Sequence, residues 1–106
     1  MASLLQATTP NGRVLKLTNE GWRHICTVHP ELEGELEKVN QTMKSPDFIK
    51  QGNRADTFMY YKFFPTTIIY RKYLVLVIKY LNTEGTVLTG YFTERIRKGD
   101  VLWRKP

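Results

Sequence analysis

The two histidines of this chain lie within one eight-residue stretch, HICTVHPE at residues 24–31. Histidine is the side chain whose protonation changes closest to neutral pH. A pair such as His24 and His29 can take a proton from a nucleophile and return one to a leaving group. The alternative is structural: one histidine near a helix end, the other at a corner, each satisfied by a backbone group. The residue types alone leave both interpretations open.

Helix geometry separates the two side chains. Five residues of a continuous α-helix rotate by about 140°, so His24 and His29 would face different directions. Pro30 cannot continue the helix that holds His24, but it suits the first turn of a second helix. We therefore expect His29 at the corner between two helices, where it can turn toward a sheet.

The same stretch does not match a metal site or a thiol enzyme. The zinc motif HExxH places two histidines on one helical face, and HICTVH lacks that pattern. No second cluster in the sequence completes a tetrahedral set of ligands. Cys26 shares the expected helical face of Trp22 and Ile25, which indicates a structural thiol. We expect no metal and no small-molecule cofactor.

A second group of candidates lies in TVLTGYFTER, residues 86–95. Alternate residues of a strand share a face, which predicts one row of side chains: Val87, Thr89, Tyr91 and Thr93, with Arg95 next in line. Gly90 would point the other way, where it permits close approach of another part of the chain. Hydroxyl groups beside an arginine suit a phosphate, although Thr and Tyr also favour any solvated strand.

The elements that would position these residues follow from periodicity and end signals. Thr18 is the expected N-cap of a helix over about 19–28. A second helix should run from Pro30 to about residue 44. Extended segments are expected at 13–17, 46–52, 56–64, 67–81, 86–96 and 100–105. The run 74–78 is apolar on both faces and should be central. The expected fold class is α+β, with two N-terminal helices packed on an antiparallel β-sheet of about four strands.

Length and charge favour one small basic domain. Residues 1–12 are expected to form a flexible leader and residues 13–106 a single domain. The net charge is +6, and residues 41–106 hold 12 of the 16 basic but 5 of the 10 acidic residues. This half suits a polyanion or an acidic protein. With one cysteine, no signal peptide and no apolar run long enough for a membrane, we expect a cytoplasmic protein with no membrane contact.

Four segments together carry a resemblance to a known family: LTNEGWRHICTVHPELEGELEKVNQTMKSPDFI, YYKFF, YLVLVIKY and VLTGYFTERIRKGDVLW. In layout they are similar to the phage-associated nuclease-like domains of the barnase–EndoU–colicin–RelE superfamily. Those domains have a His-bearing helix, HPE opening the next helix, and an antiparallel sheet ending in a T-A-Y-like strand. The resemblance covers roughly residues 13–104 and implies a metal-independent RNA endonuclease of toxin or effector type.

The resemblance also implies site residues. The family's helix histidine matches His24, the residue before Pro-Glu matches His29, and the T-A-Y element matches Thr89-Gly90-Tyr91, with Gly90 in place of Ala. The implied catalytic residues are His24, His29, Tyr91 and Thr89. The family's strand base matches Lys79. From the chemistry of metal-free RNA cleavage we also expect Arg71 or Arg95 to stabilise the phosphate, Thr93 to bind or orient it and Tyr61 to bind the RNA. This assignment requires His24 to lie within about 10 Å of Tyr91, because a longer gap exceeds a hydrogen bond or a one-water relay.

Two other function classes remain. A non-catalytic RNA- or protein-binding module would keep the fold and the basic surface. A toxin-like domain would have an acidic inhibitor protein as a second partner besides RNA. RNA cleavage in EDTA that is lost in His24→Ala would favour the enzyme, whereas salt-sensitive binding without cleavage would favour the module.

Overall fold

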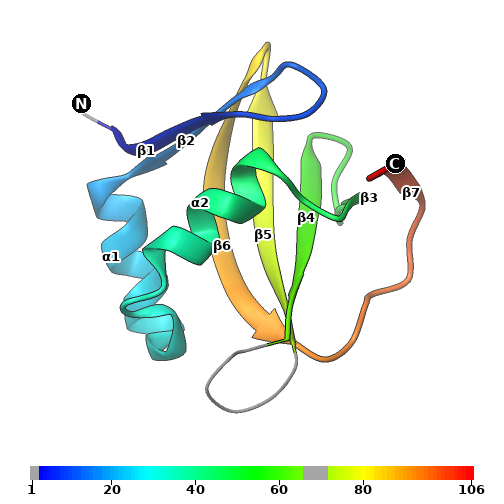
Figure 1. Cartoon of the computed structure of the whole chain (residues 1–106). Helices are drawn as coiled ribbons and strands as arrows, with labels where there is room; N and C mark the ends of the chain where they lie inside the picture. Colours follow the sequence, from blue (N-terminus) through cyan, green and yellow to red (C-terminus); the bar gives the residue numbers. More distant parts are fainter. Residues whose placement is uncertain (1–2, 66–71) are drawn as a thin grey trace.

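The computed structural model describes residues 3–65 and 72–106 and contains one β-sheet with both α-helices on one side (Figure 1). In chain order its elements are β1 (Ser3–Thr8), β2 (Val14–Thr18), α1 (Asn19–Val28), the 3₁₀-helix η1 (Pro30–Leu32), α2 (Leu36–Lys44), β3 (Phe48–Gln51), β4 (Thr57–Phe64), β5 (Lys72–Leu81), β6 (Glu84–Thr93) and β7 (Val101–Arg104). The expected Arg71 lies outside the described residues.

The sheet corrects the predicted architecture. Its seven strands have the order β1-β2-β6-β5-β4-β3-β7, and β2 pairs with β6 in parallel, with Val14 opposite Glu84. The α+β class is right, but the prediction of N-terminal helices on an antiparallel sheet of about four strands is wrong. The sheet is mixed, and two strands precede the helices. The hydrophobic pattern of a short strand does not specify a partner 70 residues away, so the parallel pairing left no local signal.

The segment expected as a flexible leader, residues 1–12, includes β1. This strand pairs antiparallel with β2, and its Ala7 is buried against the core. The turn signal at residues 10–12 is the turn of this hairpin: the Gly12 amide donates to the Thr9 carbonyl at 2.9 Å, and Gly12 has a φ of 81°. The β1–β2 hairpin therefore forms one edge of the sheet.

Helix α1 begins and ends where its end signals predict. Thr18 Oγ1 accepts a hydrogen bond from the Gly21 amide at 3.0 Å, and the helix ends at His29, directly before Pro30. The second helix is shorter than expected. Residues from Pro30 form only a 3₁₀ turn, and Gly34, with a φ of 82°, separates that turn from α2. A left-handed residue cannot continue a helix, which explains the split.

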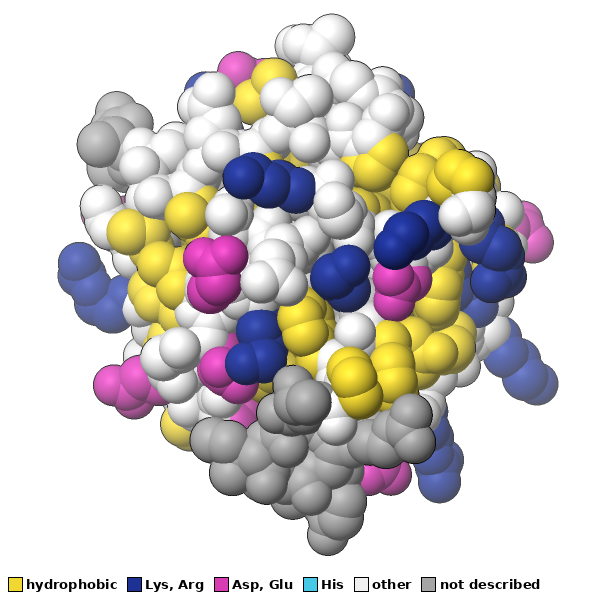
Figure 2. Space-filling model, viewed as in Figure 1, with side chains coloured by type: hydrophobic (Ala, Val, Ile, Leu, Met, Phe, Trp, Pro, Cys, Tyr) yellow, Lys and Arg dark blue, Asp and Glu magenta, His cyan; other side chains and the backbone are white. Residues whose placement is uncertain are grey.

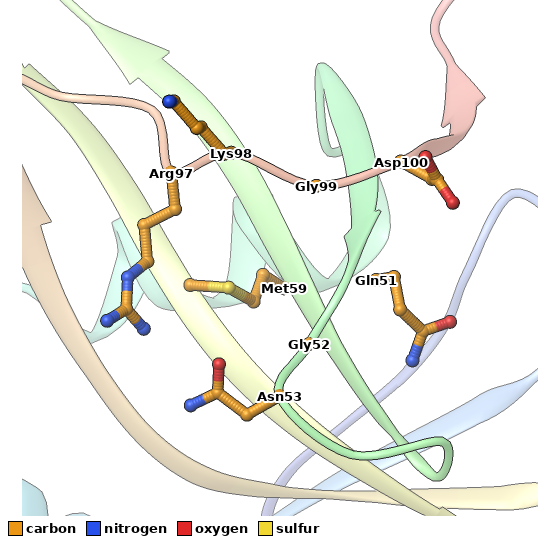
Figure 3. A pocket seen from close by; sticks show the side chains of 8 residues that line it. All are labelled: Gln51, Gly52, Asn53, Met59, Arg97, Lys98, Gly99 and Asp100. Atoms are coloured by element: carbon orange, nitrogen blue, oxygen red, sulfur yellow. The ribbon is translucent and has the colours of Figure 1, made fainter.

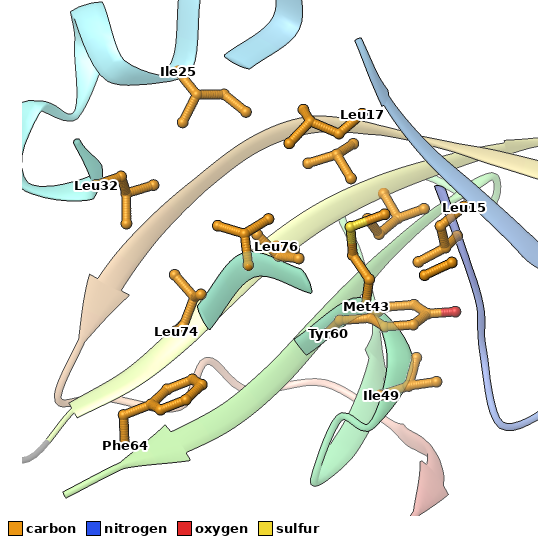
Figure 4. Packing of buried hydrophobic residues seen from close by; sticks show 14 residues of the cluster. Leu15, Leu17, Ile25, Leu32, Met43, Ile49, Tyr60, Phe64, Leu74 and Leu76 are labelled. Carbon is orange, nitrogen blue, oxygen red and sulfur yellow. The ribbon is translucent and has the colours of Figure 1, made fainter. Parts of the chain in front are cut away.

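The core lies between the helices and the sheet (Figure 4). Ile25, Leu32 and Met43 from the helical layer are each at most 1% exposed, and they pack in one cluster with Leu74 and Leu76 of β5. The prediction that residues 74–78 form a central strand is confirmed, because β5 has three strands on either side. Its second apolar face lies on the side of the sheet that has no helix, which we call the open face.

The open face has its own apolar cluster, formed by Phe48, Met59, Tyr61 and Val75. Residues 94–100, which we call the crossing segment, pass over this cluster on their way from β6 to β7. The Arg97 amide donates to the Tyr61 hydroxyl at 3.2 Å, and the buried Lys50 ammonium donates to the Arg97 carbonyl. These two contacts hold the crossing segment against the sheet.

Thr18→Ala should destabilise the protein by about 1 kcal/mol, because the variant loses the hydroxyl that caps α1. Thr18→Ser keeps an acceptor at this position and should stay within about 0.5 kcal/mol of the wild type. Urea unfolding followed by circular dichroism measures both values. Equal losses in the Ala and Ser variants would show that the cap hydrogen bond does not contribute.

Alkaline pH should destabilise the fold through Tyr60. Burial, reinforced by a hydrogen bond with Tyr80, raises the pKa of Tyr60 above its ordinary value. The folded state therefore keeps the Tyr60 proton where the unfolded chain releases it, and stability falls as pH rises above about 10. Unfolding free energies measured in urea between about pH 8 and pH 11 should fall less steeply in Tyr60→Phe. Identical slopes in the variant and the wild type would contradict this expectation.

Candidate functional site

His29 lies at the corner between α1 and η1, as the sequence predicts, and its ring lies against strand β6. The ring centroids of His29 and Tyr91 are 5.7 Å apart, with the planes tilted by 33°. The Nδ1 atom of His29 is 3.6 Å from a carboxylate oxygen of Glu31. The carboxylate therefore flanks one ring nitrogen, which leaves Nε2 as the nitrogen available to a ligand.

A close contact between η1 and β6 brings these two rings together. Leu32 is fully buried, and its Cδ1 atom lies 3.5 Å from the position that a Cβ on Gly90 would occupy. That Cβ would also come within 2.8 Å of Leu76 Cδ2 and 3.2 Å of the Val75 carbonyl oxygen. The expectation that Gly90 permits a close approach is confirmed. Because His29 precedes Leu32 by three residues and Tyr91 follows Gly90, the contact determines where the rings meet.

A β-bulge decides which side chains of β6 share the open face. Thr89 pairs with Val77, but Val87 already pairs with Ile78, so Leu88 is an extra residue. Thr89 and Tyr91 lie on the open face, whereas Val87 is 2% exposed in the core beneath the helices. The prediction that Val87 shares a face with Thr89 is therefore wrong, because the extra residue shifts the alternation by one.

Tyr91 belongs to a row of side chains across the open face. The strand register places Tyr91 beside Val75, Val75 beside Tyr61, and Tyr61 beside Phe48. Tyr61 is fully buried and stacks on Phe48 with centroids 4.8 Å apart. Burial raises the pKa of its phenol, against a smaller opposing effect of the hydrogen bond from the Arg97 amide. Tyr61 thus supports the crossing segment from below instead of facing a ligand.

Thr93 and Arg95 form the turn in which the chain leaves β6. The Thr93 hydroxyl donates to the Arg95 carbonyl, and the Arg95 amide donates to the Thr93 hydroxyl, both at 3.1 Å. The hydroxyl therefore shapes this turn. Arg95 is exposed at the start of the crossing segment, so its guanidinium can contact a ligand near Tyr91.

Two other expected residues lie apart from this group. Lys79 is four residues along β5 from Val75, the partner of Tyr91, which corresponds to about 13 Å, and its Nζ is 3.8 Å from Asp56. His24 is exposed on α1, and its side chain makes no hydrogen bond, ion pair or ring contact with another described residue. Its proximity to Tyr91 stays a prediction.

Sequence reasoning assigned no role to Glu31 beside His29 or to Arg97. The signal for Glu31 was present in HPE, since residues two apart at a tight turn can approach each other. No comparable signal existed for Arg97. Its segment has neither strand nor helix periodicity, and only the tertiary contacts of its backbone with Tyr61 and Lys50 place it over β4.

Cys26 and the acidic residues add no second centre in the described ranges. Burial raises the pKa of the Cys26 thiol, with a smaller effect of Glu33 in the same direction, which disfavours the reactive thiolate. No three His, Cys, Asp or Glu side chains gather as metal ligands among residues 3–65 and 72–106. Neither α-helix of these ranges, with 10 and 9 residues, is long and apolar enough to cross a membrane.

Comparisons of the chain with family models, with curated proteins and with solved structures found no match. The site is therefore defined by the structure alone: a mixed seven-stranded sheet has the helices on one face and the crossing segment on the other. The candidate site lies at the margin of the open face, where His29, Glu31 and Tyr91 meet.

Gly90→Ala should lower the free energy of unfolding by about 1–3 kcal/mol, because the added methyl group must displace Leu76 or the β5 backbone in a packed core. Thr86→Val is the matched control: the residue is exposed on the same strand and keeps its β-branched shape, so its effect should stay within about 0.5 kcal/mol. Urea unfolding measures both. A Gly90→Ala protein as stable as the control would show that the contact tolerates a side chain.

Proposed function

We propose that this protein is a metal-independent ribonuclease with His29 and Tyr91 at its reacting centre. The observation that carries the proposal is the contact of the two rings at 5.7 Å, with Glu31 at 3.6 Å from His29 Nδ1. The resemblance of the sequence to nuclease-like domains supports it, since His29 and Tyr91 are two of the positions that resemblance implies. The basic C-terminal half supports an RNA substrate.

The chemistry is a transesterification within RNA. His29 takes the proton of the 2′-hydroxyl, and the 2′-oxygen forms a bond to the adjacent phosphorus. The bond between phosphorus and the 5′-oxygen breaks, which yields a 2′,3′-cyclic phosphate, and the 5′-oxygen takes a proton from the Tyr91 hydroxyl. Proton return from His29 to Tyr91 through solvent restores both residues. The Glu31 carboxylate stabilises the imidazolium that forms in the first step.

Cations and hydroxyls near Tyr91 would bind the phosphate as its charge increases. Guanidinium groups form two parallel hydrogen bonds to phosphate oxygens, and Arg95, at the start of the crossing segment, is the nearest arginine along the chain. Thr89, two residues before Tyr91 on the open face, would donate a further hydrogen bond. Lys79, about 13 Å along β5, would contact RNA away from the cleaved bond.

The open face is the side we propose for RNA. Phe63, Tyr73 and Tyr91 are half-buried there, and aromatic rings on a sheet are stacking platforms for unpaired bases. On the helix-covered side, basic and acidic side chains are interspersed (Figure 2), a distribution that attracts a polyanion less than charges of one sign. RNA bound on the open face would reach His29 at the margin.

The proposal also includes an acidic inhibitor protein as a partner and the cytoplasm as the compartment. A free ribonuclease harms the cell that makes it, and the charge of +6 would attract an acidic protein to the surface that binds RNA. The single free cysteine, Cys26, suits a reducing compartment.

The test compares His29→Gln with His24→Gln in cleavage of a fluorescently labelled RNA in EDTA. His29→Gln should lose at least about 100-fold in rate, the usual range for a proton-transfer residue. His24→Gln, on the exposed face of α1, should lose less than about threefold. Circular dichroism and RNA affinity, expected to match the wild type in both variants, exclude misfolding as the cause.

Other outcomes distinguish the remaining functions. Wild-type protein that binds RNA in a salt-sensitive manner but does not cut it would overturn the ribonuclease and favour the binding module. Equal loss of cleavage in His24→Gln and His29→Gln would place both histidines in the reacting centre. Unchanged cleavage in His29→Gln would remove His29 from it.

A further inference from the structure

A cavity of about 470 Å³ opens on the open face, between the β3–β4 connection and the crossing segment (Figure 3). Met59 of β4 lies in its interior, Gln51 and Asn53 belong to one wall, and Arg97, Lys98 and Asp100 belong to the other. Its volume falls within the range of sites that hold small molecules, about 300–1,000 Å³. The reacting centre proposed above does not include this cavity.

Hydrogen bonds fix both walls. The Gln51 amide donates to the Asp100 carbonyl at 3.0 Å, which joins one wall to the other. The Arg97 backbone is held on both sides, by the Tyr61 hydroxyl and by the buried Lys50 ammonium. Both contacts use the backbone of Arg97, and its side chain lines the cavity beside Met59.

Glycine keeps the β3–β4 wall close to the sheet. A Cβ on Gly52 would come within 2.8 Å of the Thr57 carbonyl oxygen, and the Gly52 amide donates to that same oxygen at 2.9 Å. A side chain at this position is excluded, so the connection turns tightly and presents Asn53 at the mouth of the cavity. The cavity is therefore largely formed before a ligand arrives.

The chemistry of the lining suits one nucleotide. Met59 offers an apolar, polarisable surface for a base, and the carboxamide of Asn53 can donate to and accept from base edges. The Gln51 carboxamide nitrogen donates to the Arg54 and Thr57 carbonyls, at 2.8 and 3.1 Å, so this side chain offers a base only its oxygen as an acceptor. Arg97 and Lys98 supply two positive charges against the single carboxylate of Asp100. In Figure 3, the side chains of Arg97 and Asn53 lie on one side of Met59, and those of Gln51 and Asp100 lie on the other.

The cavity lies within reach of the RNA strand in the proposed complex. Met59 is two residues along β4 from Tyr61, which is about 7 Å, and Tyr61 is two strands from Tyr91, which is about 10 Å. The path from the reacting centre to the cavity is therefore about 12 Å along the sheet surface. The crossing segment connects the two sites. Its Arg95 lies just after β6, which holds Tyr91, and its Arg97 lines the cavity together with Met59.

We propose that this cavity binds a nucleotide neighbouring the cleaved bond, with the Arg97 guanidinium on its phosphate and the Asn53 carboxamide on its base. The place of the cavity in the reaction rests on the proposed ribonuclease function, whereas nucleotide binding itself does not. Such a site would set the sequence preference of cleavage, because the base of the neighbouring nucleotide would contact the Asn53 side chain.

The test is a titration of the ¹⁵N-labelled full chain with each of the four 5′-mononucleotides, followed by NMR, with inorganic phosphate as a separate ligand. The amide signals of Gly52, Asn53, Lys98 and Gly99 should shift with nucleotides. Arg97→Gln should weaken nucleotide binding by about tenfold, which is about 1.4 kcal/mol, because it removes a charged hydrogen bond and keeps both backbone contacts.

Arg54→Gln is the matched control, since it removes an exposed arginine on the same connection whose side chain does not line the cavity. Its nucleotide affinity should stay within about twofold of the wild type. Asn53→Ala should change the relative affinities of the four nucleotides and leave phosphate binding unchanged. Equal weakening by Arg54→Gln and Arg97→Gln, or binding of phosphate as tight as that of every nucleotide, would overturn the proposal.

The outcomes separate this inference from the proposed function. His29→Gln should bind mononucleotides with wild-type affinity. If the wild type binds nucleotides in the cavity but cleaves no RNA, the ribonuclease fails and the nucleotide site stands. If RNA is cleaved but the amide signals around Met59 do not shift, the cavity proposal alone fails.

Discussion

The packing of Leu32 on Gly90 is the contact on which the candidate site depends. Leu32 Cδ1 lies at contact distance, 3.5 Å, from the place of a Cβ on Gly90, and that Cβ would also come within 2.8 Å of Leu76 Cδ2 and 3.2 Å of the Val75 carbonyl oxygen. His29 lies just before the turn and Tyr91 just after the glycine, so one apolar contact in the core sets a polar contact at the surface. The residues that react with a ligand would thus be positioned by residues that no ligand touches.

The two faces of the sheet differ in how much apolar surface they bury. The helix-covered face holds most of the buried apolar side chains, and burial of apolar surface is the dominant favourable contribution to folding. The open face buries only a small cluster, and the crossing segment covers part of it. Lys50 and Tyr61 hold that segment through its backbone, so the Arg97 side chain is left for other contacts. The crossing segment therefore presents basic side chains beside the aromatic residues of the open face.

Local signals in the sequence predicted local structure well. Thr18 and Pro30 gave the ends of α1, and the apolar run of β5 gave the central strand, because capping, proline and burial act over a few residues. The bulge at Leu88 was not predictable, since one extra residue in a strand leaves no recognisable signal in the hydrophobic alternation. His29 could be placed at a corner from Pro30 alone. Arg97 could not be placed, because contacts with distant residues determine its position.

The parallel pairing of β2 with β6, three residues long, joins an early and a late part of the chain. Val14 meets Glu84 across a loop of 70 residues, and closing a loop of that length costs entropy before any contact compensates for it. During synthesis the β1–β2 hairpin can pair with β6 only after β6 has left the ribosome. Helix α1 follows directly from β2, so the corner with His29 reaches its final place only then. The parallel pairing of β2 with β6 and the placement of the His29 corner are therefore coupled.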